Sequence, residues 1–168
     1  SIQLNDTHPA LAIPELMRLL IDEHEMEWDQ AWDITRRVFS YTNHTLLPEA
    51  LEVWPVTFFE RILPRHLQII YLLNRALLDE ISARHPNDQD RRQRMSLIDE
   101  SHGRMVRMAH LAIFASHTVN GVAKLHGDVS RQMCGGMWPG LPASDVPIGH
   151  ITNGVHARTW VSDRVDQL

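Results

Sequence analysis

Three short stretches of this sequence gather side chains that both donate and accept hydrogen bonds. They are Asn5-Asp6-Thr7-His8, Thr42-Asn43-His44-Thr45 and Thr152-Asn153. Short polar side chains ahead of a proline also make good turns, because they bond to nearby backbone groups. Two interpretations therefore stand for the first stretch, a capping turn before Pro9 and part of a ligand site.

The wider set of polar candidates consists of amides, imidazoles and carboxylates. Its members are Asn5, Asp6, His8, Asn43, His44, Glu52, His117, Asn120 and Asn153. Such groups suit paired donor and acceptor contacts with sugar hydroxyls, so this chemistry favours a carbohydrate ligand. Motifs for other chemistries are missing: His24 has no second histidine at zinc-helix spacing, and neither a glycine-rich phosphate loop nor a Gly-x-Ser-x-Gly turn occurs. We therefore expect no metal site.

Hydrophobic patterning predicts the elements that position these residues. Strands are expected over residues 2–4, 39–42, 95–98, 117–122 and 149–152, and helices over 14–23, 28–38, 64–84, 106–115, 123–132 and from Ala157. Residues 135–147 are rich in glycine and proline and are expected to form a loop. Strands that alternate with helices indicate an α/β fold with a parallel sheet. Since each polar stretch follows a strand, all three are expected at the carboxyl edge of the sheet, where ligands bind.

Composition narrows the class of protein. The chain has 168 residues, the length of about one domain, and a net charge of -5, which argues against nucleic-acid binding. The most apolar run, residues 67–78, is too short to span a bilayer, so we expect no membrane partner. A single cysteine, Cys134, fits a reducing compartment and predicts a cytoplasmic location. Because the first residue is not methionine, we expect the chain to begin inside something larger or to have been processed.

Five collinear stretches closely resemble the α-glucan phosphorylases, the family of glycogen, starch and maltodextrin phosphorylases. They are QLNDTHPALAIPELMR, YTNHTLLPEALE, PRHLQIIYLLN, MAHLAIFASHTVNGVAKLH and TNGVHARTW. They cover nearly the whole chain in the family's order. The segment CGGMWPGLPASDVPIGH and the pair Val155-His156 look more like bacterial members than animal ones.

The resemblance implies a fold and a reaction. Residues 1–150 would be the later, helix-rich part of the N-terminal Rossmann-like lobe of the two-lobed glycosyltransferase (GT-B) fold. Residues 151–168 would cross into a missing C-terminal lobe. The family phosphorolyses a terminal α-1,4-linked glucose to glucose 1-phosphate, so α-1,4-glucan and inorganic phosphate are the implied partners. A homo-oligomer of the whole protein is compatible with the resemblance.

Residue roles are carried over from the family only by position. His44 matches a catalytic histidine that holds the sugar 6-hydroxyl and whose carbonyl lies near the charge developing at the anomeric carbon. Asn153 matches a contact to a glucosyl hydroxyl. Asp6, His8 and Glu52 match residues of the pocket beside the glucose site. Trp160 matches a tryptophan near the cofactor.

The family's cofactor is pyridoxal 5'-phosphate, carried on a lysine of the C-terminal lobe. The one lysine of this chain, Lys124, lies outside the matching motif and reads as a helix-surface charge. The resemblance therefore places the cofactor lysine outside the chain and implies that the chain alone is inactive. Two alternatives stay open: a nucleotide-sugar glycosyltransferase of the same fold, and a non-catalytic helical interaction module built on the helix at residues 64–84.

Overall fold

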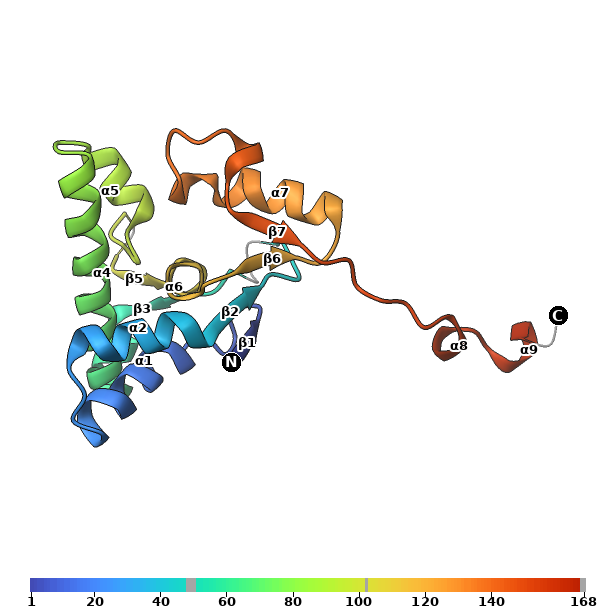
Figure 1. Cartoon of the computed structure of the whole chain (residues 1–168), viewed down its shortest axis with the longest axis horizontal. Coiled ribbons are helices and arrows are strands. Elements are labelled where there is room, and N and C mark those ends of the chain that lie inside the picture. The colour runs from blue at the N-terminus through green and yellow to red at the C-terminus, as the bar shows by residue number, and fades with distance from the viewer. Residues whose placement is uncertain (48–50, 102, 167–168) are drawn as a thin grey trace.

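The protein is built around a four-stranded parallel sheet covered by helices. The C-terminal segment extends away from the sheet (Figure 1). A computed structural model describes residues 1–47, 51–101 and 103–166. We refer to residues 1–150 as the body and to residues 151–166 as the tail. No helix among the described residues has the length and apolar character needed to cross a membrane.

The parallel sheet has the strand order β1-β2-β6-β7. Its strands are β1 (Ile2–Asn5), β2 (Phe39–Thr42), β6 (Val119–Gly121) and β7 (Ile148–His150). Each neighbouring pair is parallel, with Leu4 opposite Tyr41, Tyr41 opposite Val119, and Val119 opposite Ile148. The predicted α/β class and parallel sheet are confirmed. All four carboxyl ends consequently lie at one edge, as a parallel arrangement requires.

Most of the predicted helices are present. They are α1 (Ala12–Arg18), continued by the π-helical turn η1 (Leu19–Glu23), α2 (Trp28–Val38), α4 (Pro64–Arg84), α6 (Met108–Ala115) and α7 (Lys124–Cys134). In α4, Pro64 occupies the first turn, where a missing N–H costs nothing. α7 packs along β6 and β7, α6 packs on β2, and α1 packs on α4. The loop predicted over residues 135–147 holds only two short 3-10 turns, η3 (Gly135–Met137) and η4 (Ala143–Asp145).

A second sheet and two helices were not predicted. The sheet is antiparallel, with the order β3-β5-β4, and consists of β3 (Val53–Pro55), β5 (Met105–Arg107) and β4 (Ile98–Asp99). The helices are α3 (Val56–Ile62) and α5 (Gln89–Met95). The strand predicted over residues 95–98 is wrong except at Ile98. The backbone N–H of Leu97 donates to the side-chain Oδ1 of Asn74 at 2.8 Å. The hydrogen bond that a neighbouring strand would accept from Leu97 is therefore made to a side chain instead, and the strand begins only at Ile98.

One hydrophobic core joins the sheet to the helices. It includes Leu4 and Tyr41 from the strands and Leu73 from α4, all buried. Trp32 of α2 packs on Phe114 of α6, with ring centroids 5.2 Å apart. The core thus fixes the strands whose ends carry the polar stretches.

The tail contrasts with the body because nothing in the described structure covers it. It contains α8 (Ala157–Trp160), as predicted from Ala157, and α9 (Asp163–Asp166). Apolar side chains along it are exposed, Trp160 to 78%. Figure 1 shows this segment running away from the sheet.

Candidate active site

The turns after β1 and β2 are tied directly to each other. We call Asn5, Asp6, Thr7 and His8 the first polar turn, and Thr42, Asn43, His44 and Thr45 the second polar turn. Asp6 has a left-handed backbone (φ 56°), a conformation that aspartate tolerates better than most residues. Its N–H donates to the Thr42 carbonyl at 2.8 Å, and its Oδ1 accepts the His44 N–H at 2.7 Å. The first polar turn therefore sets the backbone of the second.

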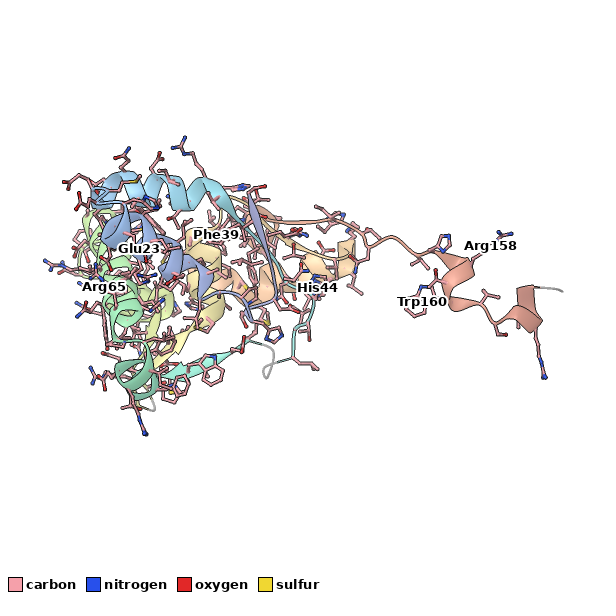
Figure 2. The ribbon with its side chains drawn as sticks, turned by 90° about the horizontal axis from the view of Figure 1, so that it is seen from below. Glu23, Phe39, His44, Arg65, Arg158 and Trp160 are labelled. Carbon is pink, nitrogen blue, oxygen red and sulfur yellow. The ribbon has the colours of Figure 1, made fainter. Side chains whose placement is uncertain are left out.

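His44 is held at both its backbone and its ring, yet it stays exposed. Its Nε2 lies 3.3 Å from Oδ1 of Asn5, while Asp6 accepts its N–H. Figure 2 shows His44 at the edge of the body from which the tail departs. The imidazole is thus positioned by the neighbouring strand and remains available to a ligand.

Two amides that were candidates for sugar contacts form hydrogen bonds within the protein instead. Asn43 and Asn120 are buried. Oδ1 of Asn120 accepts the Thr42 hydroxyl at 2.9 Å, and its Nδ2 donates to the Gly121 carbonyl at 2.9 Å. Oδ1 of Asn43 accepts the Thr45 N–H at 3.0 Å. Because buried polar groups need such partners, these amides brace the strand ends.

Glu52 connects the first polar turn to the antiparallel sheet. Its Oε2 accepts the Thr7 hydroxyl at 2.6 Å and lies 3.2 Å from Nδ1 of His8. Its backbone carbonyl accepts the Met108 N–H at 3.0 Å. Sequence reasoning selected Glu52 and His8 but missed Thr7, which is buried and supplies the shortest of these bonds. Its only sequence signal was its place in the polar turn.

The remaining two predicted residues lie on the tail. The backbone N–H of Asn153 donates to the Val122 carbonyl at 3.0 Å, just past the end of β6, so Asn153 shares the carboxyl edge of the sheet. Trp160 is 78% exposed and lies away from His44 (Figure 2). The structure thus brings together Asp6, His8, His44 and Glu52, places Asn153 at the same edge, and leaves Trp160 apart.

The residues present do not fit a pyridoxal phosphate site. A lysine that carries this cofactor must be held as a reactive amine, but the Lys124 side chain is 78% exposed and pairs with Asp128 at 3.1 Å. This confirms Lys124 as a surface charge. Within the described ranges, no group of three or more His, Cys, Asp or Glu side chains could hold a metal ion.

The assembled site has the chemistry of a binding surface for a hydroxyl-rich molecule. It offers an imidazole, an amide and a carboxylate on neighbouring turns whose backbones are fixed by hydrogen bonds. The Carbohydrate phosphorylase family matches residues 1–168. The chain belongs to the carbohydrate phosphorylase family.

Named relatives of this phosphorylase chain agree with the family match. It is 51% identical to the brain form and 52% identical to the liver form of glycogen phosphorylase from Bos taurus, each over 161 residues and 96% of the chain. Over the whole of the present chain, it is 49% identical to glycogen phosphorylase 2 from Dictyostelium discoideum. The chain spans only 19% of each bovine protein and 17% of the Dictyostelium one. It is thus similar to about a fifth of a glycogen phosphorylase.

These relatives do not favour the two alternatives left open by the sequence, a nucleotide-sugar glycosyltransferase and a helical interaction module. The likeness to bacterial members stays a prediction.

Proposed function

We propose that this chain is the sugar-binding part of an α-glucan phosphorylase, an enzyme that phosphorolyses terminal α-1,4-linked glucose of glycogen or maltodextrin to glucose 1-phosphate. The observation that carries the proposal is the joining of the first and second polar turns through Asp6 and His44, in a chain whose family match covers residues 1–168. α-1,4-glucan and inorganic phosphate are the proposed substrates.

His44 has the central role in this proposal. Its imidazole binds the 6-hydroxyl of the terminal glucose, and its carbonyl faces the positive charge that develops at the anomeric carbon. A carbonyl stabilises such charge best when its direction is fixed in advance. The bond from the His44 N–H to Asp6 supports this role because it fixes the peptide on one side of the residue.

The other residues shape the pocket around the sugar. Glu52 accepts the Thr7 hydroxyl and sits beside His8, an arrangement that suits positioning of water and neighbouring groups. Asn153 contacts a second glucosyl hydroxyl, with its backbone anchored at the end of β6. Asp6 orients His44 and does not touch the reacting atoms.

The complete enzyme requires parts that this chain does not supply. We infer that residues 1–150 belong to the N-terminal Rossmann-like lobe of a GT-B fold and that residues 151–168 cross into a C-terminal lobe. That lobe would carry pyridoxal 5'-phosphate, with Trp160 near it. Exposure of Trp160 in the isolated chain is consistent with such a missing neighbour. We further infer a cytoplasmic enzyme, a homo-oligomer when complete, with neither nucleic acid nor membrane as partner.

The test is His44→Ala in the complete enzyme. Losing a hydrogen bond and an orientation that act in the transition state costs about 2–4 kcal/mol, so turnover should fall roughly 30- to 1000-fold while the unfolding midpoint changes little. His24→Ala is the matched control, because His24 is exposed and its neighbour Glu23 lies at the end of the body away from His44 (Figure 2). Glucose 1-phosphate release from maltoheptaose is the readout. Near-normal turnover of His44→Ala would refute the assignment.

The 168-residue chain alone provides a second test. It should release no glucose 1-phosphate and acquire no pyridoxal absorbance, because its one lysine is a solvent-exposed partner of Asp128. Incubation with pyridoxal phosphate followed by borohydride reduction measures the labelling. Stoichiometric labelling of Lys124 together with turnover would show that the chain is a complete catalyst and that the proposed division of labour is wrong.

A further inference from the structure

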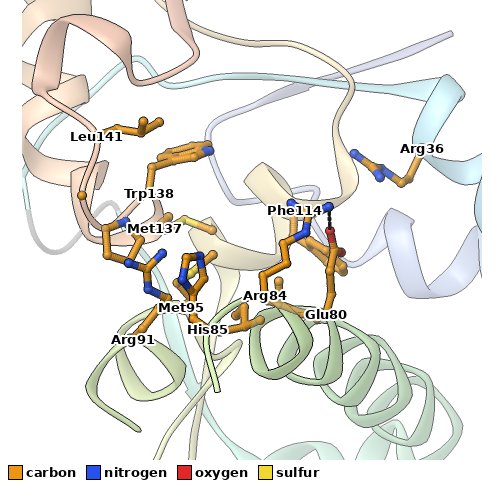
Figure 3. Close-up of a pocket in the computed structure, with 14 residues that line it drawn as sticks. Arg36, Glu80, Arg84, His85, Arg91, Met95, Phe114, Met137, Trp138 and Leu141 are labelled. Atoms are coloured by element: carbon orange, nitrogen blue, oxygen red, sulfur yellow. Dashed lines mark ion pairs between the residues drawn. The ribbon is translucent and has the colours of Figure 1, made fainter. Parts of the chain in front are cut away.

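A pocket of about 680 Å³ lies at the edge of the parallel sheet opposite the candidate active site. α2 enters β2 at this edge, and α6 leads into β6 here, so the pocket borders the amino ends of strands whose carboxyl ends carry the polar turns. Its walls come from α2, α4, α5, α6 and the segment at residues 137–141 (Figure 3). None of the proposed sugar-binding residues lines it.

The inner surface of this pocket is apolar and partly aromatic. It is formed by Leu77, Ile81, Met95, Phe114, Met137 and Trp138. Phe114 and Trp138 supply aromatic faces from different parts of the fold, and Figure 3 shows them on either side of the pocket. Such surfaces favour a flat apolar body, since ring contacts add to the gain from burial.

The rim carries an excess of positive charge. Three arginines line the pocket, Arg36 from α2, Arg84 from α4 and Arg91 from α5, against one carboxylate, Glu80. Arg84 pairs with Glu80 at 2.7 Å, and Arg91 pairs with Asp88 at 3.0 Å. Within the described chain Arg36 forms no ion pair, and its guanidinium lies 6.0 Å from the centre of the Trp32 ring. Arg36 is therefore the cation left for an incoming anion.

A smaller cavity of about 270 Å³ extends this pocket inward and shares with it Arg36, Phe114 and Trp138. Ser116 lines the extension and is only 7% exposed, yet its hydroxyl has no hydrogen-bond partner among the described residues. A buried hydroxyl without a partner is costly, and such groups in native structures call for an explanation. A polar atom of a bound ligand would satisfy it.

We propose that this pocket binds an anion with a flat aromatic body, as in an aromatic phosphate or carboxylate. The anionic group lies at the rim against Arg36 and Arg84, where guanidinium groups form charge-assisted hydrogen bonds with such oxygens. The aromatic body lies between Phe114 and Trp138, and a polar substituent on it reaches Ser116. The site is separate from the proposed sugar site, so binding there does not depend on phosphorolysis.

The test is calorimetric titration of the 168-residue chain with 1-naphthyl phosphate, with neutral 1-naphthol as the matched ligand. Saturable binding of one molecule per chain is expected, with 1-naphthol at least about tenfold weaker. In the amide NMR spectrum, the indole N–H signal removed by Trp138→Phe should be the one that shifts most on titration. Equal binding of the two ligands would show that the pocket takes apolar molecules in general and would overturn the proposal.

Paired arginine variants test which cations bind the anionic group of the ligand. Arg36→Gln should weaken binding about tenfold, whereas Arg37→Gln, on the same helix and paired with Asp33 at 2.5 Å, should leave it unchanged. Arg84→Gln and Arg75→Gln form a second pair on α4, because each arginine pairs with an acid four residues away but only Arg84 lines the pocket. Equal effects within both pairs would refute the site. Binding by the chain but not by the complete protein would show that another part of the protein fills the pocket.

Discussion

The body and the tail of this phosphorylase-family chain both carry polar stretches, but only in the body do these stretches bond to one another to form a candidate site. The Asp6 carboxylate accepts the backbone N–H of His44, 38 positions away in the sequence, because β1 and β2 run side by side in parallel. On the tail, the backbone of Asn153 is anchored, whereas Trp160 remains exposed. A motif therefore specifies local shape, and neighbouring strands supply the contacts that give its side chains fixed positions.

The strongest test of this comparison removes an apolar side chain from each region. Leu73→Ala in α4 should lower the free energy of unfolding by about 2–5 kcal/mol, because Leu73 is completely buried and the change leaves a cavity. Val165→Ala in the tail should change it by less than about 0.5 kcal/mol, since Val165 is 58% exposed. Urea unfolding followed by circular dichroism measures both. A comparable loss from Val165→Ala would mean that the tail packs on the body in solution.

A second test uses pH, because a partly buried histidine lies in the body and an exposed one in the tail. Burial, reinforced by the Arg107 cation, lowers the pKa of His110 from 6.5 to about 4. The unfolded chain then binds a proton below pH 6.5 that the folded chain does not. Stability should therefore be full above pH 6.5 and fall as the pH drops toward 4, by up to about 3 kcal/mol.

Unfolding free energies at about pH 7 and about pH 5 provide the measurement, within the window where this histidine titrates. His110→Gln should flatten the dependence on pH, whatever its effect on stability at neutral pH. His156→Gln, on the exposed tail, should retain the full dependence. An unchanged slope in His110→Gln would assign the pH effect to other groups.

The smallest expected effect comes from removing most of the tail. A chain that ends at Gly154 keeps the Asn153 anchor and loses residues whose described side chains are exposed. Its free energy of unfolding should stay within about 0.5 kcal/mol of that of the whole chain, because little apolar surface leaves the core. Urea unfolding of the two chains decides this, and a clear loss of stability would contradict the division into body and tail.

Sequence patterns were most informative where periodicity was long and regular. The helices at Trp28–Val38 and Pro64–Arg84 have their predicted bounds, and the parallel sheet followed from strands alternating with helices. The antiparallel sheet escaped prediction because its strands have two or three residues each, too few for a period. α5 escaped because its sequence, QDRRQRM, shows no apolar stripe, and its N-terminus depends on the Asp88 side chain accepting the Arg91 N–H at 2.9 Å.

The candidate site, too, could be predicted only in part. Convergence of the polar turns could be predicted, because parallel strands bring their carboxyl ends together. The sequence could not predict which of their side chains remain available to a ligand. Asn43 and Asn120 have the same chemistry as Asn153 in the sequence, and only burial shows that they serve the strand ends. Thr7 likewise gains its role from Glu52, a residue 45 positions away.

Glu52 makes the first polar turn hard to exchange by itself. Its carboxylate accepts the Thr7 hydroxyl, and its carbonyl accepts the Met108 N–H, so this one residue ties the first polar turn to the start of α6. Grafting the turn onto another scaffold therefore requires position 52 as well, together with β3, which begins at the next residue. The smallest unit that could be transplanted for the proposed sugar site is therefore a pair of segments 45 positions apart in the sequence.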